Sequence, residues 1–334
     1  MIDIAIRESA FRAAAESAVV CTVRGLSAIR IDGDDAAQFL QNQLSSDVAA
    51  LAAGTSHWSS YNSAKGRVIA TLRLWCDNSG FGALVASDLA ASTAKRLSMF
   101  VLRAKARISD QSAVRAMLGV AGPQAADVLA AVVGVSPALD AAIAIDHADA
   151  TVVGLGDGRF LIVCDAADVD ALRADIAKRA AAADENVWHW LSINGGIPTI
   201  TAATTDQFVP QMLNWDALGG ISFQKGCYPG QEIIARMRYL GRLKERLYGF
   251  HAGTDDPPDA GARIYSPAFG ETPCGTIINA APAPNGGHAL LAVVQISAIE
   301  ADALSLDGED GPRLTRFALS YPIPPNETPR GRIA

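Results

Sequence analysis

A single cysteine close to the start of an expected helix is the side chain best suited to chemistry in this sequence. Residues 223–232 read FQKGCYPGQE, so Cys227 lies two positions after Lys225. A Pro-Gly pair indicates a turn, and residues 231–240 are expected to form a helix that Gly241 ends. The partial positive charge of a helix N-terminus and a nearby ammonium both favour the thiolate. The segment therefore predicts a reactive thiol at Cys227.

The same spacing has a second interpretation, which the residue types leave open. Cys227 can equally be a small buried core residue beside glycines that only shape a turn, because a lone thiol near a helix start is common. Glu232 falls in the first turn of the expected helix, where a carboxylate complements the helix dipole in any protein. Spacing alone does not separate a functional thiol from a structural one.

Other patterns that carry chemistry are missing from the sequence. Its five cysteines contain no CxxC pair and its five histidines show no HxH or HxxxH spacing, so we expect neither a metal site nor a disulfide framework. The run GLGDG at residues 154–158 lacks the spacing of a dinucleotide fingerprint and precedes an expected strand. The sequence has no phosphate-binding loop of the GxxxxGKS or GxxxxGKT type, which argues against nucleotide hydrolysis.

The composition is that of a globular protein with more than one domain. The chain has 334 residues, of which 50% are hydrophobic and 19% charged, and its net charge is −7; this length predicts two or three domains. The acidic balance argues against direct nucleic-acid binding. Residues 272–299 lack charged side chains, but prolines and glycines interrupt them, so no membrane span is expected. The N-terminal residues resemble no signal peptide, and we expect a cytoplasmic protein in a reducing compartment.

Strands and helices alternate through the first 240 residues. Residues 67–75 show the alternation of a strand, and residues 81–87 are expected to pair with them across a turn at 77–80. Residues 34–51 place apolar side chains at helical spacing behind an N-cap at Asp34. Further strands are expected at 19–24, 26–31, 105–109 and 159–164, and further helices at 89–102, 124–133 and 169–182.

The character of the chain changes after Gly241. Proline and glycine become frequent, and short apolar runs are separated by turns, which is typical of a small β-barrel. We therefore place a domain boundary near residue 241, between an α+β region at 1–240 and a C-terminal β-barrel at 241–334.

The whole of this pattern resembles a known family. The run KGCYPGQE at residues 225–232 is similar to the motif of the YgfZ branch of the aminomethyltransferase superfamily, which includes the glycine-cleavage T-protein, GcvT. The flanking sequences GIP at 196–198 and FVPQMLN at 208–214 agree with that branch, as do FLQ at 39–41 and KGR at 65–67. The likeness extends from about residue 26 to residue 296.

The resemblance implies a fold, a ligand and a function. The fold is α+β and GcvT-like, with two intertwined α+β modules and a C-terminal β-barrel around a central opening that binds tetrahydrofolate or a one-carbon derivative. The function is support of iron–sulfur enzymes, by assembly or repair, including enzymes that thiomethylate tRNA; such enzymes are the implied clients. The motif cysteine is functional in this branch. Carried over, the site comprises Cys227 and Lys225, with Gly226, Tyr228, Gly230, Gln231, Glu232 and Arg236 around them.

One feature bears on whether the chain is an enzyme, and a second bears on folate binding. T-proteins follow the turn equivalent to Lys65, Gly66 and Arg67 with two aspartates, one of which interacts with the reacting folate nitrogen. Ala70 and Thr71 occupy those positions here, and neither supplies a carboxylate. Aminomethyl transfer is therefore disfavoured, and a folate-dependent one-carbon transferase is the alternative function. The Lys65–Arg67 cations suit the carboxylates of a folate glutamate tail, although a solvated turn explains them equally well.

A basic cluster follows the motif. Part of it complements the C-terminus of the expected helix, and the rest faces solvent, an anionic tail or a partner. The cluster consists of Arg236, Arg238, Arg242, Lys244 and Arg246.

Overall fold

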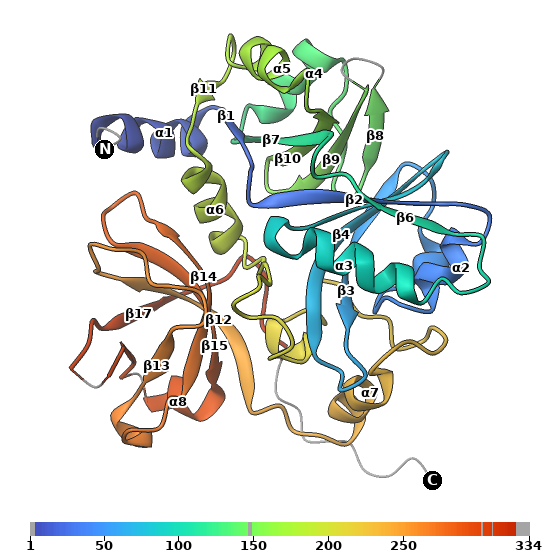
Figure 1. Cartoon of the computed structure of the whole chain (residues 1–334). Helices are drawn as coiled ribbons and strands as arrows, with labels where there is room; N and C mark the ends of the chain where they lie inside the picture. The colour runs from blue at the N-terminus through green and yellow to red at the C-terminus, as the bar shows by residue number, and fades with distance from the viewer. Residues whose placement is uncertain (1–3, 146–148, 302, 309, 325–334) are drawn as a thin grey trace. The chain divides into compact units, whose positions relative to one another are not determined.

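The fold is taken from a computed structural model that describes residues 4–145, 149–301, 303–308 and 310–324 (Figure 1). The chain forms two compact units whose segments interleave along the sequence. Unit 1 comprises Met1–Leu40, Val48–His57 and Leu72–Trp188, and unit 2 comprises Gln41–Asp47, Trp58–Thr71 and His189–Ala334. Neither unit is a continuous stretch of the sequence.

Unit 1 contains a six-stranded sheet in the order β11-β1-β7-β10-β9-β8. All its pairings are antiparallel except that of β1 with β11. Apolar residues of helices α4 and α5 pack on the sheet in one core that includes Leu118, Val152 and Leu172. The strands are β1 (Val19–Thr22), β7 (Arg115–Ala121), β8 (Ala142–Ile145), β9 (Ala150–Gly156), β10 (Arg159–Asp165) and β11 (Ala181–Ala182), and the helices are α4 (Ala125–Val133) and α5 (Val169–Ile176).

A second, five-stranded sheet has the order β3-β4-β5-β2-β6. Strand β4 pairs with β5 through the turn that joins Asp77 to Gly80, which confirms the predicted hairpin. Residues of β3 and β4 belong partly to unit 1 and partly to unit 2. The strands are β2 (Leu26–Asp32), β3 (Thr55–Asn62), β4 (Val68–Asp77), β5 (Gly80–Ala86) and β6 (Arg107–Asp110), and helix α3 covers Ser87–Met99.

The C-terminal part of unit 2 is a curled six-stranded sheet in the order β16-β13-β14-β15-β12-β17 (Figure 1). Its core gathers Phe250, Ile277 and Leu290, and the β-rich character predicted from the turn density is confirmed. The domain boundary at residue 241 stays a prediction. The elements are β12 (Glu245–Ala252), β13 (Arg263–Tyr265), β14 (Gly275–Pro282), β15 (His288–Gln295), β16 (Ser305–Leu306), β17 (Leu314–Phe317), helix α8 (Ile296–Ala301) and the 3₁₀ turn η4 (Pro267–Phe269).

Six elements remain. Helix α7 positions the candidate site, and η3 precedes it in the same unit. None of the described helices has the length and apolarity required to cross a membrane. These elements are α1 (Ile4–Glu16), α2 (Ala36–Gln41), α6 (Glu185–Asn194) and α7 (Gln231–Tyr239), with the 3₁₀ turns η1 (Val48–Ala50) and η3 (Pro210–Leu213).

The prediction of a helix at residues 34–51 is wrong beyond its first turns. The helix predicted at residues 169–182 forms but ends early. Helix α2 stops at Gln41, and Leu44 instead forms an antiparallel bridge with Tyr61. The hydroxyl of Ser45 then donates to the Gly220 carbonyl. Short hydroxyl side chains compete with the helical backbone for hydrogen bonds, so the apolar spacing is not sufficient to continue the helix. Helix α5 similarly ends at Ile176 before the short strand β11.

Candidate functional site

Cys227 lies at the exposed tip of a loop that leads into α7. Lys225 and Tyr228, on either side, are buried, at 9% and 6% exposure, whereas Gly226 and Cys227 are exposed. Gly230 forms the N-cap with a φ of 78°, a left-handed conformation that glycine adopts without strain. The loop therefore presents the thiol to solvent between two buried side chains.

The Lys225 ammonium is held by the backbone. Its Nζ donates hydrogen bonds of 2.7 Å to the carbonyl oxygens of both Leu44 and Ser46. These carbonyls are available because α2 ends at Gln41 and Leu44 instead bridges to Tyr61 of β3. Burial lowers the pKa of Lys225 to about 8, against a weaker opposing effect of Asp47. The ammonium thus fixes the loop to residues 44–46.

Tyr228 provides the second buried anchor of the loop. The Lys225 Nζ lies 5.1 Å from the centroid of its ring, a distance at which a cation is attracted to the aromatic face. The phenol oxygen is buried without a hydrogen-bond partner among the described residues, and burial raises the pKa of Tyr228 to about 12. The phenol is neutral at physiological pH, so it adds no charge beside the ammonium.

The start of the loop is attached to the far end of α7. The Phe223 ring lies 4.3 Å from the guanidinium carbon of Arg238 and meets the Tyr239 ring edge-on, with centroids 6.3 Å apart. The helix is held in turn by Gln211, whose Nε2 donates to the Ile234 carbonyl at 2.7 Å. Because both ends of the loop are anchored, the position of Cys227 is set by the fold of unit 2.

Two glycines bring together the two segments that the sequence singles out. A Cβ on Gly230 would lie 2.5 Å from the Gly66 Cα and 2.5 Å from the Ser63 carbonyl oxygen. Gly66 itself has a φ of 70° and closes the β3–β4 turn by donating to Ser63 at 2.9 Å. In Figure 1 the tip of this hairpin lies beside α7. Only glycine at position 230 allows this approach.

Replacing Gly230 with alanine is therefore expected to lower the free energy of unfolding by about 2–4 kcal/mol, because the new Cβ meets backbone atoms that cannot rotate away. Gly219→Ala is the matched control: Gly219 has a φ of 73° and nothing within 4 Å of an added Cβ. The control variant should lose only about 1 kcal/mol, which is the strain of placing alanine in a left-handed backbone conformation. Chemical denaturation measures both losses, and equal losses would contradict the close packing of Gly230 on Gly66.

The Lys65–Arg67 turn carries two exposed cations. Arg67 donates from Nη1 to the Gln207 carbonyl at 2.7 Å, while its own carbonyl accepts from the Ser63 amide. Below the turn, the buried end of β3 is polar: Ser60 donates to Asn62 Oδ1 at 3.1 Å. The Asn62 Nδ2 is buried with no hydrogen-bond partner among the described residues, so it is an unsatisfied donor.

The positions that the family resemblance equates with the T-protein aspartates hold small buried side chains. Ala70 is fully buried and Thr71 is 5% exposed. The Thr71 Oγ1 accepts a hydrogen bond of 3.1 Å from the Ile200 amide, so this side chain has a structural partner. Neither residue supplies a carboxylate to a bound folate.

The other four cysteines lie in different surroundings from Cys227. All five are free thiols. Burial raises the pKa of Cys21 to about 12 and that of Cys164 to about 11, and it also raises the pKa values of Cys76 and Cys274. Raised values hold these sulfurs in the thiol form, which is a poor nucleophile. Cys227 is the exposed member of the set.

Two further sequence patterns concern metal and phosphate sites. No cluster of three metal-ligating side chains occurs among the residues that the structure describes. Asp157 and Gly158, both with positive φ, join β9 to β10 in a tight hairpin. This connection has the geometry of a two-residue hairpin turn, so GLGDG precedes a strand and not a helix.

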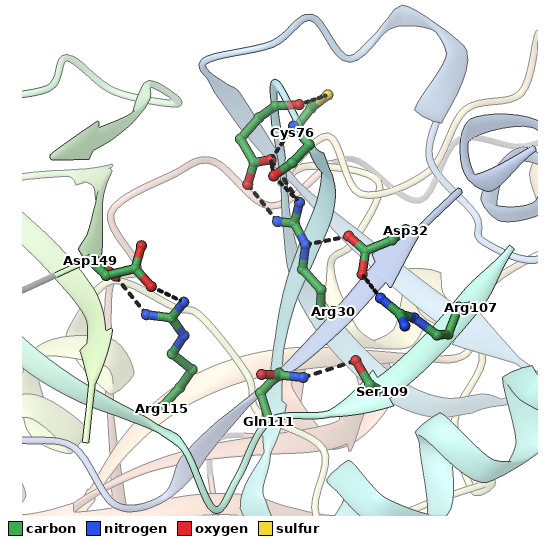
Figure 2. A network of polar contacts seen from close by, with 10 residues as sticks. Arg30, Asp32, Cys76, Arg107, Ser109, Gln111, Arg115 and Asp149 are labelled. Atoms are coloured by element: carbon green, nitrogen blue, oxygen red, sulfur yellow. Dashed lines mark hydrogen bonds and ion pairs between the residues drawn. The ribbon is translucent and has the colours of Figure 1, made fainter. Parts of the chain in front are cut away.

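Sequence reasoning missed a cavity of about 970 Å³ in unit 1. Its lining is polar: Arg30 donates to both Asp77 oxygens and to Asp32, and Arg115 donates to Asp149. Figure 2 labels Arg30, Asp32, Arg115 and Asp149. Burial opposes ionisation of Asp77, but the hydrogen bonds from Arg30 hold its pKa at about 2. The alternation of Arg30 and Asp32 on β2 is the only local signal. Because these cations are paired with carboxylates, the cavity has no marked preference for an anion.

Comparison with known proteins identifies the family of the chain. Residues 3–146 match the family model described as the GCVT N-terminal domain. The tRNA-modifying protein YgfZ of Edwardsiella ictaluri is 34% identical over 299 residues, covering 88% of this chain and 89% of that protein. The YgfZ of an Escherichia coli O7:K1 strain is 31% identical over 296 residues, covering 88% and 90%. The chain belongs to the YgfZ family.

A solved structure supports the fold. The glycine cleavage system aminomethyltransferase T from Bartonella henselae superposes with a TM-score of 0.74, covering 93% of this chain and 87% of that one. Its sequence identity is 16%, so the likeness establishes the architecture and not the activity. The GcvT-like α+β fold expected for the YgfZ family is thereby confirmed.

Proposed function

We propose that this member of the YgfZ family is a folate-binding accessory protein that supports the assembly or repair of iron–sulfur enzymes through Cys227. The clients include enzymes that thiomethylate tRNA, in keeping with the tRNA-modifying name of its relatives. One observation carries the proposal: Cys227 is exposed between Lys225 and Tyr228, both of which are buried. A core cysteine would be covered, whereas this one is held at the surface by anchored neighbours.

Tetrahydrofolate, or a one-carbon derivative of it, is the ligand that we assign to the protein. The residues at the β3–β4 hairpin fit such a molecule, because Lys65 and Arg67 are exposed cations for glutamate-tail carboxylates. The unpartnered Asn62 Nδ2 adds a buried donor nearby in the chain. When bound, the folate supplies one-carbon chemistry; the chain supplies binding and the Cys227 thiol.

The double variant Lys65→Ala, Arg67→Ala is expected to weaken binding of polyglutamated tetrahydrofolate by about tenfold or more, since each lost charge contact contributes roughly 1 kcal/mol. The monoglutamate should lose less, because it presents fewer carboxylates. Calorimetric titration measures both, starting from a wild-type affinity in the micromolar range, about −8 kcal/mol.

The matched control removes two exposed cations elsewhere, Lys95 and Arg96 of α3. It should leave the affinity within about twofold, because long-range charge effects are screened by salt. No binding of the wild type at millimolar folate would contradict the ligand assignment. Equal losses in the two double variants would contradict the role of the turn.

The alternative function is a folate-dependent one-carbon transferase. The buried Ala70 and the hydrogen-bonded Thr71 count against it, since no carboxylate stands at either position. Incubation with tetrahydrofolate and a one-carbon donor, followed by product analysis, separates the two functions. Turnover would favour the transferase. An accessory protein gives no product, and it restores tRNA thiomethylation in cells that lack their own homologue.

A free thiol at Cys227 suits a reducing compartment, and we place the protein in the cytoplasm. Direct contact with tRNA is not part of the proposal, because the net charge of −7 repels a polyanion.

A further inference from the structure

Helix α7 has an exposed face that combines cations with aliphatic side chains. Ile233, Arg236 and Leu240 are three and four residues apart, so they lie on one side of the helix. Ile233 is 39% and Leu240 72% exposed, and Arg236 is exposed between them. These three residues, with the exposed Arg242 and Lys244 that follow the helix, are called the α7 face.

The charge of this region is opposite to that of the chain. Residues 231–244 contain one exposed acid, Glu232, and four exposed cations: Arg236, Arg238, Arg242 and Lys244. The whole chain has a net charge of −7. None of the four cations forms an ion pair with an acidic side chain in the described part of the chain. Apart from Arg238, whose guanidinium lies over the Phe223 ring, their charges are left for a partner of opposite sign.

The aliphatic side chains indicate which class of partner fits. Aliphatic groups at the centre of a protein interface gain from burial, while surrounding charges set orientation and association rate. A nucleic-acid backbone would use the cations but not Ile233 or Leu240. At long range the net negative charge of the chain would also repel it. The observations thus favour a protein surface that is acidic around an apolar centre.

The α7 face adjoins the segments on which the proposed function depends. The helix starts directly after the Cys227 loop, and an added Cβ on Gly66 would lie 2.9 Å from the Ile233 Cβ. A partner seated on this face covers the helix that directly follows the Cys227 loop. We propose that the α7 face is the docking site for an acidic protein partner. This inference rests on the proposed function, under which that partner is an iron–sulfur enzyme served by Cys227.

The test measures binding of a purified tRNA-thiomethylating iron–sulfur enzyme, from the same organism as the chain, by biolayer interferometry at several salt concentrations. The charge-reversed variant Arg236→Glu, Arg242→Glu is expected to lose about tenfold or more in affinity, with a weaker salt dependence. Leu240→Ser should lose several-fold without changing the salt dependence, because it removes apolar contact only. The control Arg96→Glu, Arg103→Glu, which reverses two exposed cations of unit 1, should stay within about twofold.

The docking site is overturned if the wild type and the α7-face variants bind the enzyme with equal affinity, or if the control variant loses as much affinity as they do. It is also overturned if the wild-type protein does not bind the enzyme. Another contradicting result is that the wild-type protein binds bulk tRNA and the α7-face variants do not, which would make this face a nucleic-acid surface. The proposed function is tested separately. The Cys227→Ala variant should bind the enzyme like the wild type yet fail to support it in cells. Full support by the α7-face variants would refute the docking site and leave the function standing.

Discussion

Cys227 is expected to react with iodoacetamide at neutral pH at least about tenfold faster than any other cysteine of the chain. It is exposed, whereas Cys21, Cys164 and Cys274 are buried and burial raises their pKa values. Cys76 is partly exposed, yet its pKa is also raised, mainly by burial. Mass spectrometry of peptides sampled over time gives all five rates in one experiment on the native protein.

The Cys227→Ala variant should separate function from stability. An exposed thiol contributes little packing, so the free energy of unfolding should change by less than about 0.5 kcal/mol. In cells that lack their own homologue, the variant should fail to restore tRNA thiomethylation.

Cys274→Ala is the matched control, because Cys274 is 1% exposed in the core of the C-terminal sheet. That variant should lose about 1–2 kcal/mol of stability and keep its function. Slow labelling of Cys227 together with full complementation by its alanine variant would show that the thiol has no functional role.

The elements around the site were predictable to the extent that local patterns determine them. The β4–β5 hairpin follows from alternation on either side of a tight turn, and the strand-rich C-terminal sheet follows from turn density. The helix expected to run to residue 51 fails because the Ser45 hydroxyl has partners outside the helix. Apolar spacing predicts which side chains are buried. It does not predict the hydrogen-bond partners of the backbone.

The site itself depends on contacts that no local pattern encodes. The sequence indicates Lys225 as a neighbour of the thiol, but its ammonium bonds to the carbonyl of Leu44, 181 residues away in the chain. The Gly66–Gly230 approach likewise joins two segments that the sequence shows separately. The resemblance to a family supplied the residues of the site, and the structure supplies the way in which they are held.

Lys225 is expected to make stability depend on pH in a direction opposite to that of an ordinary paired cation. Its folded-state pKa is about 8, lowered by burial from 10.5. Between these values the unfolded chain binds more protons than the folded chain, so stability rises with pH. The favourable contribution is complete above the unfolded value and is lost as pH falls through about 8. The difference in unfolding free energy between the wild type and Lys225→Met should therefore widen from pH 7 to pH 10.

The same variant tests whether Lys225 positions the Cys227 loop. Methionine has a similar length but no donor, so the carbonyls of Leu44 and Ser46 lose a hydrogen bond, a cost of about 1–3 kcal/mol when they stay buried. Hydrogen exchange of the amides in residues 223–230 should become faster, and support of tRNA thiomethylation should fall, while Cys227 remains available to iodoacetamide. Lys244→Met is the matched control, because Lys244 is exposed near the same helix; in that variant the Cys227 loop should exchange like the wild type. Unchanged exchange in Lys225→Met would mean that the buried ammonium does not hold the loop, and a stability difference that narrows with pH would mean that burial does not lower the pKa of Lys225. A widening difference with faster exchange would identify Lys225 as the residue that keeps the thiol in place.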